Sequence, residues 1–215
     1  MQAERRNRAR VVRVTSHRAD AIVRVGDLRR TDHVLDVGCA DGQVVVDIAP
    51  FVAHVHGVDI SADRVAEASG RAAERAVRNA TFETVPIQDH PLEPMSWDVS
   101  LFMRTWGKGA GARRIGGADL NRVLRATRRQ AFVLAGVKRD PERLPEILRI
   151  CEANGFDALC FIKPHLIVAN RRDSDARIRV LPKYALVQDG DGLARTPTAS
   201  LDDHPIVRSL LQRAA

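Results

Sequence analysis

Residues 34–42 read Val-Leu-Asp-Val-Gly-Cys-Ala-Asp-Gly, a short apolar strand that runs directly into a glycine-containing loop. Asp36 lies near the end of this strand, and Gly38 and Gly42 allow a ligand to approach the backbone closely because they carry no Cβ atom. A second apolar strand ends in Asp59, roughly 20 residues further on, where an acidic side chain can accept hydrogen bonds from two ribose hydroxyl groups. The pattern predicts a site for a nucleoside with a charged tail.

The spacing within the loop disfavours two other nucleotide-binding motifs. A dinucleotide fingerprint reads G-x-G-x-x-G/A, whereas this loop reads G-x-A-x-G and Gln43 occupies the position of the third small residue. The sequence contains no Gly-Lys-Ser/Thr triplet, which a P-loop requires. The ligand is therefore not expected to be a dinucleotide or a nucleotide held by a P-loop.

The block D-V-G-C-A-D-G followed by G-V-D-I resembles the first two motifs of the class I S-adenosylmethionine-dependent methyltransferases. The resemblance covers roughly residues 30–171 and implies S-adenosylmethionine as the cofactor. In that family the first acid and the glycines hold the methionine end, and the second acid holds the ribose. The corresponding residues here are Asp36, Gly38, Cys39, Ala40, Gly42 and Asp59. Ala40 stands where many members have glycine, and we expect it to cause only a local shift.

Length and composition are those of a globular enzyme. A chain of 215 residues forms one domain with an appendage and can bury a substantial core. No apolar run approaches the roughly 18 residues of a membrane span, and the arginine-rich start lacks the apolar segment of a secretory signal. The three cysteines lack C-x-x-C spacing, which predicts reduced thiols. We therefore expect a cytoplasmic protein without a membrane partner, and the sequence leaves the oligomeric state open.

The net charge of +7 raises the question of a nucleic-acid partner. It arises from 34 Lys and Arg against 27 Asp and Glu, and nearly all the basic residues are arginines. Basic charge is typical of proteins that bind nucleic acids or anionic substrates. RNA-binding proteins usually add exposed aromatic residues that stack on bases, whereas here Tyr184 is the only tyrosine and no aromatic residue is interleaved with the basic runs. A small-molecule substrate is preferred, and RNA is kept as the alternative.

Strands alternate with helical stretches along the chain, which predicts an α/β fold with a doubly wound, mostly parallel sheet. Ser16 and Ser61 are expected to cap helices over 17–28 and 62–78, and a further helix opens at Asp140-Pro141 and closes at Gly155. Strands are expected at 33–37, up to Asp59, and at 81–85, 97–103, 131–137, 158–162 and 166–169.

The last two of these strands are joined by only Lys163-Pro164-His165, so they must be antiparallel neighbours. A sheet that ends in such a hairpin resembles the seven-strand, Rossmann-like methyltransferase core. We expect a basic N-terminal segment and helix over 1–30, the core domain over 31–171 and a C-terminal extension over 172–215, which contains a turn at 188–192 and an amphipathic segment at 204–214.

Ligands of open α/β sheets bind at the carboxyl ends of the strands, which selects further candidates. After the third strand the resemblance implies an acid or amide that binds the adenine amino group, and Gln88 and Asp89 are the candidates. Ile60 is expected to pack on the adenine, and Met103 ends the strand that resembles the fourth motif, near the reacting methyl group. The segment that follows supplies candidates for substrate binding, namely Arg104, Trp106 and Lys108. The N/D-P-P-Y/F signature of methyltransferases acting on DNA bases or protein amides is missing.

A base is needed only if the substrate nucleophile must lose a proton. His165 is preferred because its turn is expected on the ligand side of the sheet, His90 comes second and His17 third, although no motif distinguishes them. His54 and His56 share one strand face, but no third ligand stands at metal spacing, so no metal site is predicted.

The sequence thus predicts a methyltransferase that moves a methyl group from S-adenosylmethionine to an oxygen or nitrogen of a small molecule, such as a natural-product or sugar-type metabolite. The alternatives are an RNA methyltransferase anchored by its basic N-terminus, and a non-catalytic protein that uses the same fold for regulation or assembly.

Overall fold

The computed structural model describes residues 14–103, 105, 115–134, 143–161, 166–179, 184–189 and 192–197; for residue 161 and the last two segments it describes only the backbone. The strands are β1 (His33–Val37), β2 (His54–Asp59), β3 (Ala80–Thr84), β4 (Trp97–Met103), β5 (Thr127–Leu134), β6 (Phe156–Phe161), β7 (Leu166–Arg171), β8 (Tyr184–Asp189) and β9 (Gly192–Pro197). The helices are α1 (His17–Val25), α2 (Gln43–Ile48), α3 (Ala62–Glu74), α4 (Gly117–Ala126) and α5 (Arg143–Ala153), with a 3₁₀ turn η1 (Ala49–Phe51).

The described strands form one sheet in the order β3-β2-β1-β4-β5-β7-β6-β8-β9. The first five strands in this order are parallel, and β7 is antiparallel to both β5 and β6. The predicted α/β fold, with seven core strands and a terminal antiparallel hairpin, is confirmed. Because the strand order reverses between β1 and β4, their carboxyl ends border the crevice in which open α/β sheets bind ligands.

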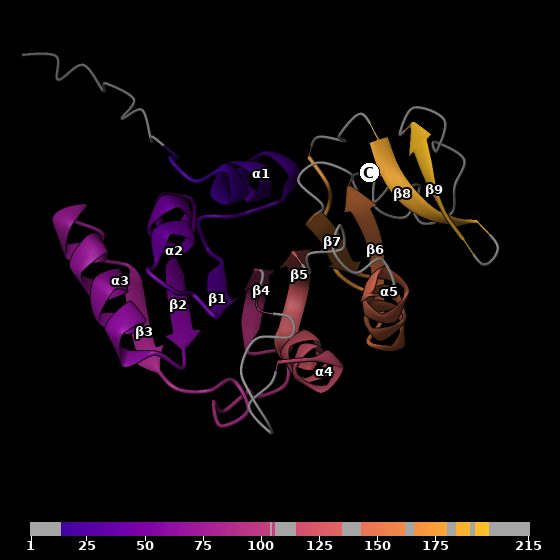
Figure 1. Cartoon of the computed structure of the whole chain (residues 1–215). Helices are drawn as coiled ribbons and strands as arrows, with labels where there is room; N and C mark the ends of the chain where they lie inside the picture. Colours follow the sequence, from indigo (N-terminus) through magenta and orange to yellow (C-terminus); the bar gives the residue numbers. More distant parts are fainter. Residues whose placement is uncertain are drawn as a thin grey trace, which may run out of the picture.

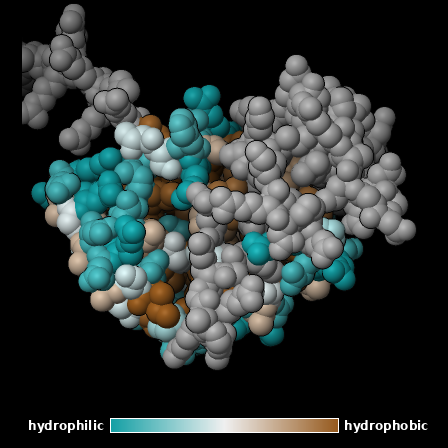
Figure 2. Space-filling model, viewed as in Figure 1, coloured by the Kyte–Doolittle hydropathy of each residue, from teal (hydrophilic) through white to brown (hydrophobic). Residues whose placement is uncertain are grey.

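Helices cover both faces of the sheet (Figure 1). On one face, α1 and α2 bury aliphatic side chains such as Ile22 and Val45 against Val34 of β1. On the other face, α4 and α5 bury Leu124 and Ile147 in a second cluster. The outer side of α3, at the left of Figure 2, is hydrophilic. None of the described helices is both long and apolar enough to cross a membrane.

Two helix caps that the sequence predicts are confirmed. The Ser16 hydroxyl accepts hydrogen bonds from the first turn of α1, and the Ser61 hydroxyl accepts one from the Arg64 amide of α3. Both helices end earlier than expected, at Val25 and Glu74. In α3 the reason is Ala76, whose φ of +53° turns the backbone out of the helix, so that the next amide bonds back to the helix end.

The expected start of the fifth strand, residue 131, was wrong, because β5 begins at Thr127. The first residues of β5 are polar, so the pattern of apolar residues did not indicate a strand there. Each buried polar side chain in this stretch nevertheless has a partner. Thr127 bonds to Ser100 of β4, and Gln130 bonds to Asn170 of β7. Arg129 binds two aspartates of the connection between α1 and β1. Hydrogen bonds and ion pairs of buried polar side chains, rather than burial of apolar ones, therefore stabilise the first residues of β5.

Two connections differ from a simple alternation of strand and helix. Residues 85–96, between β3 and β4, contain turns and no helix, so no helix from this crossover covers the adjoining face of β2 and β3. In the C-terminal extension, β8 and β9 form an antiparallel hairpin that continues the sheet beyond β6 (Figure 1). The predicted amphipathic segment at 204–214 lies outside the described residues.

Candidate functional site

A cavity of about 650 Å³ opens at the carboxyl ends of β1, β2 and β4. Its wall includes most of the residues predicted to bind a nucleoside cofactor: Asp36, Gly38, Cys39, Ala40, Asp59, Ile60, Gln88 and Met103. Ile60 is 57% exposed, which is unusual for a large apolar side chain in this protein. An apolar surface of this kind beside polar groups suits an aromatic ring system.

The loop after β1 reaches the cavity through left-handed backbone conformations. Gly38 has a φ of +70°, and a Cβ atom there would lie 2.1 Å from Cγ2 of Thr105. Ala40 has a φ of +49°, which is costly for a residue with a side chain. Its amide donates a hydrogen bond of 2.9 Å to Oδ2 of Asp59, and this bond holds the strained position in place.

Gly42 does not line the cavity, unlike the other predicted residues of the loop. It precedes α2 with a φ of +72°, and a Cβ atom there would lie 2.7 Å from the Cβ of Ala68 in α3. The glycine is required because α2 and α3 approach each other closely at this point. The structure therefore shows a packing role for Gly42, and its contact with the cofactor stays a prediction.

The two acids of the motif occupy different environments. Asp36 is only 2% exposed, and burial, followed by the charge of Asp59, raises its pKa to about 7. Asp59 is half-buried; besides the bond from Ala40, its Oδ1 accepts a bond of 3.0 Å from the Ser61 amide at the start of α3. Asp59 thus orders the loop, fixes the residue that caps α3 and lines the cavity.

Three buried polar atoms of cavity-lining residues have no hydrogen-bond partner among the residues that the structure describes. They are Oδ1 of Asp36, Nε2 of Gln88 and Oγ1 of Thr105. Since buried polar groups are almost always hydrogen-bonded, their convergence on one cavity indicates a polar ligand. A carboxylate suits an ammonium group and an amide suits the edge of an adenine ring. These donors and acceptors fit the two ends of S-adenosylmethionine.

Two predicted residues lie away from this wall. Asp89 is exposed and is not part of the cavity lining. His90 is 6% exposed, and its Nδ1 lies 3.1 Å from Oε2 of Glu83 on β3 instead of facing the cavity. The turn after β3 explains this, because the Asp89 and His90 amides both bond back to the Pro86 carbonyl and redirect the chain. The remaining predicted residues, Arg104, Trp106, Lys108 and His165, lie outside the described ones.

The sequence reasoning named only one site residue in the N-terminal segment, His17, the third candidate base, and it missed the others that line the cavity. Thr15 through Arg18, at the start of α1, line it together with Gln43. Asp47 of α2 anchors this segment: its carboxylate accepts bonds from the amides of Thr15 and Ser16 and from Nη1 of Arg75. The carboxylate in the apolar run Val44-Val-Val-Asp-Ile48 is the sequence feature that could have indicated such an anchor.

Cysteine chemistry is not indicated at this site. All three cysteines are free and buried, and burial is the main cause that raises the pKa of the Cys39 thiol well above its usual range. A protonated thiol is a weak nucleophile. Gly57 instead allows Cys39 to pack closely on β2, since a Cβ atom at residue 57 would lie 2.9 Å from the Cys39 side chain.

Comparison with known proteins agrees with this geometry. A family model described as a methyltransferase domain matches residues 28–155. Among solved structures, the YcgJ protein of Bacillus subtilis is 19% identical with a TM-score of 0.56, and the match covers 65% of this chain and 68% of that chain. Magnesium protoporphyrin IX methyltransferase from Synechocystis, solved with S-adenosylmethionine, is 21% identical with a TM-score of 0.53 over 67% and 72% of the two chains.

A third similar structure is geranyl diphosphate C-methyltransferase from Streptomyces coelicolor, which is 14% identical with a TM-score of 0.56 over 72% of this chain and 76% of that chain. At these identities the structures show a common fold, and the family model identifies the domain. The cofactor predicted from the motif, S-adenosylmethionine, agrees with both. The chain belongs to the class I S-adenosylmethionine-dependent methyltransferase family.

Proposed function

We propose that this methyltransferase acts on an oxygen or nitrogen atom of a small molecule, of the natural-product or sugar type. The observation that carries the proposal is the cavity of about 650 Å³ lined by the carboxylates of Asp36 and Asp59 and by Gln88 and Thr105, whose buried polar atoms lack a partner among the described residues. Its volume lies within the range of sites for small molecules, roughly 300–1,000 Å³, a range that includes the cofactor itself. The two similar methyltransferases whose names give a substrate, magnesium protoporphyrin IX and geranyl diphosphate, also act on small molecules.

When bound, S-adenosylmethionine supplies an activated methyl group, so the protein chiefly has to position the reactants. Asp36 would hold the ammonium group at the methionine end, Asp59 the ribose hydroxyls, and Gln88 with Ile60 the adenine. A nucleophile that must lose a proton needs a base nearby. Among the histidines in the described part of the chain, His17 lines the cavity, which favours it over His90 for this role.

The charges of the described residues argue against the RNA alternative. Many arginines that would otherwise present a basic surface form ion pairs, and others bind backbone carbonyls, as Arg122 and Arg171 do. The paired ones include Arg64 with Glu67, Arg71 with Asp41, Arg75 with Asp47, Arg128 with Asp98 and Arg172 with Asp157. Neutralised guanidinium groups release few counterions from a phosphate backbone, which would leave binding to RNA weak at physiological salt.

The cofactor assignment is tested at Asp59 by calorimetric titration of S-adenosylhomocysteine. Loss of charge-assisted hydrogen bonds to the ribose is worth about 1.5–3 kcal/mol, so Asp59→Asn should weaken binding about 10- to 100-fold. Because Asp59 also bonds to the amides of Ala40 and Ser61, circular dichroism must show that the variant is folded. Ser61→Ala is the matched control, because it removes the side-chain cap of α3 at a residue that does not line the cavity.

Equal affinity in the wild type and a folded Asp59→Asn variant would contradict the assignment, and an equal loss in Ser61→Ala would place the effect in α3. The substrate class is tested separately, with labelled S-adenosylmethionine and two acceptor pools, small-molecule metabolites and an RNA transcript. Transfer to the metabolites is the expected result. Transfer to RNA, together with RNA binding that persists at physiological salt, would reverse the preference. Absence of turnover with either would favour the non-catalytic alternative.

A further inference from the structure

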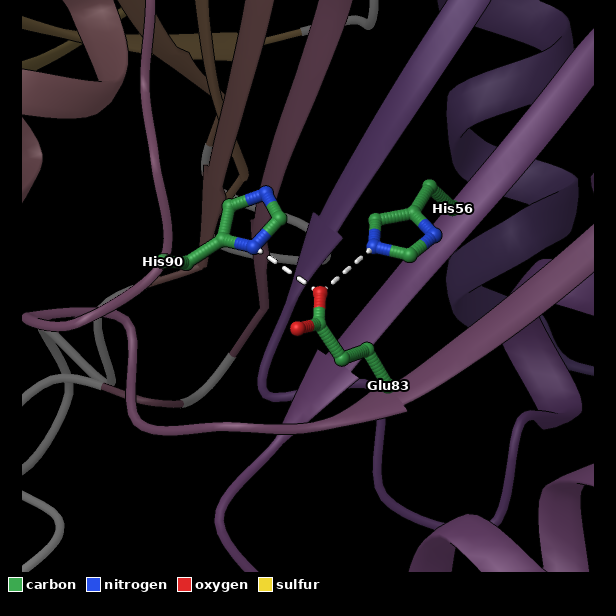
Figure 3. A group of neighbouring side chains, drawn as sticks. All are labelled: His56, Glu83 and His90. Atoms are coloured by element: carbon green, nitrogen blue, oxygen red, sulfur yellow. Dashed lines mark hydrogen bonds and ion pairs between the residues drawn. The ribbon is translucent and has the colours of Figure 1, made fainter.

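A second cluster of polar side chains lies between β2, β3 and the loop that follows β3, outside the lining of the cofactor cavity. His56 comes from β2, Glu83 from β3 and His90 from the loop that follows β3, and the three side chains point toward one another (Figure 3). None of them lines the cavity. The connection 85–96, which contributes His90, contains turns and no helix.

Two of the distances within the cluster are close to those between two ligands of one metal ion. Oε2 of Glu83 lies 3.3 Å from Nε2 of His56 and 3.1 Å from Nδ1 of His90, and the three ligand atoms all lie within 4.8 Å of one another. Zinc binds imidazole nitrogen and carboxylate oxygen at about 2.0–2.2 Å, so two ligands of a tetrahedral ion are separated by about 3.4 Å. Small side-chain movements would therefore suffice to place one ion between the three atoms.

We propose that His56, Glu83 and His90 form a binding site for a divalent transition-metal ion such as Zn²⁺. Imidazole nitrogen favours zinc and its neighbours in the transition series, whereas Mg²⁺ and Ca²⁺ prefer sites made entirely of oxygen ligands. The Glu83 side chain is 46% exposed, so water has access to the remaining coordination positions. The single carboxylate balances part of the charge of the ion.

The surroundings orient the two imidazole rings. Nδ1 of His56 lies 2.8 Å from the hydroxyl of Thr81, and this contact leaves Nε2 directed toward Glu83. The His56 ring stacks between Trp97 and His90, with centroid distances of 5.8 and 5.4 Å. Outer contacts of this kind fix the rotamer and tautomer of metal-binding histidines.

The loop that carries His90 connects this cluster to the cofactor cavity. Ile87 and Gln88 line the cavity, and Arg122 of α4 donates hydrogen bonds to the carbonyls of Ile87, Gln88 and His90. An ion bound to His56, Glu83 and His90 would fasten this loop to β2 and β3. The proposed ion would thus have a structural role next to the cofactor site, and the proposal does not depend on the substrate proposed above.

The competing arrangement is a hydrogen-bond network without an ion. In it, the Glu83 carboxylate accepts a hydrogen bond from each imidazole, and His56 accepts one from Thr81. His54 provides a matched control because it lies on the same face of β2 and contacts the same Thr81 hydroxyl, with 2.9 Å between Nε2 and Oγ1, yet it is not part of the ligand group.

The test uses the full chain without a histidine tag, treated with chelator and then titrated with ZnCl₂ in a calorimeter and with CoCl₂ by visible absorption. We expect one ion per chain in the wild type and in His54→Ala. Substitution of residues that only contact the metal ligands already costs about 10- to 100-fold in metal affinity, so the loss of a ligand in Glu83→Gln or His90→Ala should cost at least about 100-fold. Circular dichroism checks that each variant is folded.

Three results would overturn the proposal: a folded wild type that takes up no Zn²⁺, unchanged affinity in both Glu83→Gln and His90→Ala, or an equal loss in His54→Ala. Titration of S-adenosylhomocysteine into the same proteins gives an independent readout. Binding of S-adenosylhomocysteine without Zn²⁺ uptake would reject the metal site and leave the methyltransferase assignment intact.

Discussion

Replacement of Asp36 by asparagine is expected to stabilise the free protein while weakening its cofactor binding. The Asp36 carboxyl is buried at the end of β1, and its Oδ1 has no hydrogen-bond partner among the described residues. Burial, and next the neighbouring charge of Asp59, raise its pKa from 3.8 to about 7. A rise of this size means that ionisation of Asp36 costs the folded protein about 4 kcal/mol.

The sign of the pH dependence follows from which state holds the proton. Between pH 3.8 and about 7 the folded protein keeps a proton on Asp36 that the unfolded chain has released. The contribution of this group to stability is therefore fully present below pH 3.8 and is lost as the pH rises to about 7. Asparagine carries no charge and has no such loss, so the Asp36→Asn variant should gain up to about 4 kcal/mol at pH 8 and much less at pH 5.

The assay is urea unfolding of the wild type and Asp36→Asn at both pH values, since the titration of all other groups cancels in the comparison. Titration of S-adenosylhomocysteine at pH 8 supplies the second measurement. Loss of a charge-assisted bond to the ligand ammonium group should weaken binding about 10- to 100-fold. Equal stabilities at pH 8 would refute the buried-charge argument, and equal affinities would show that Asp36 does not meet a cationic group.

Three further substitutions test other parts of the site and the fold. Gly38→Ala places a Cβ atom 2.1 Å from the side chain of Thr105 at a φ of +70°. It should lower the free energy of unfolding by about 1–3 kcal/mol, measured in thermal melts, and abolish cofactor binding. Gly70→Ala, on the open surface of α3, should be neutral or slightly stabilising in the same melts. Arg129→Met leaves the buried Asp32 without an ion-pair partner among the described residues, whereas Asp27 keeps Arg29 and Arg179. It should lower the free energy of unfolding by about 3–5 kcal/mol, and a loss below about 1 kcal/mol would contradict this. Asp47→Asn should release the N-terminal segment from α2 and weaken S-adenosylhomocysteine binding at least about tenfold; unchanged binding would remove that segment from the site.

Local sequence determined most of the architecture and the centre of the site. Strand and helix periods, the serine caps and the short hairpin connection act over a few residues, so they can be read without the fold. Asp36 and Asp59 were placed correctly on the cavity wall for the same reason, since both acids lie at the ends of apolar strands whose carboxyl ends must meet at one edge of a parallel sheet.

Tertiary structure alone decided features that depend on partners distant in the chain. The polar start of β5 becomes a strand only because Ser100, Asn170 and the buried aspartates satisfy it. Residues 15–18 line the cavity, where Asp47 of α2, 29 or more residues further along the chain, binds the amides of Thr15 and Ser16. The sequence presented His54 and His56 as a pair without a third ligand, whereas strand register and the turn after β3 bring Glu83 and His90 to His56. Hydrogen-bond and coordination partners are set by spatial neighbours, and spacing along one chain does not reveal them.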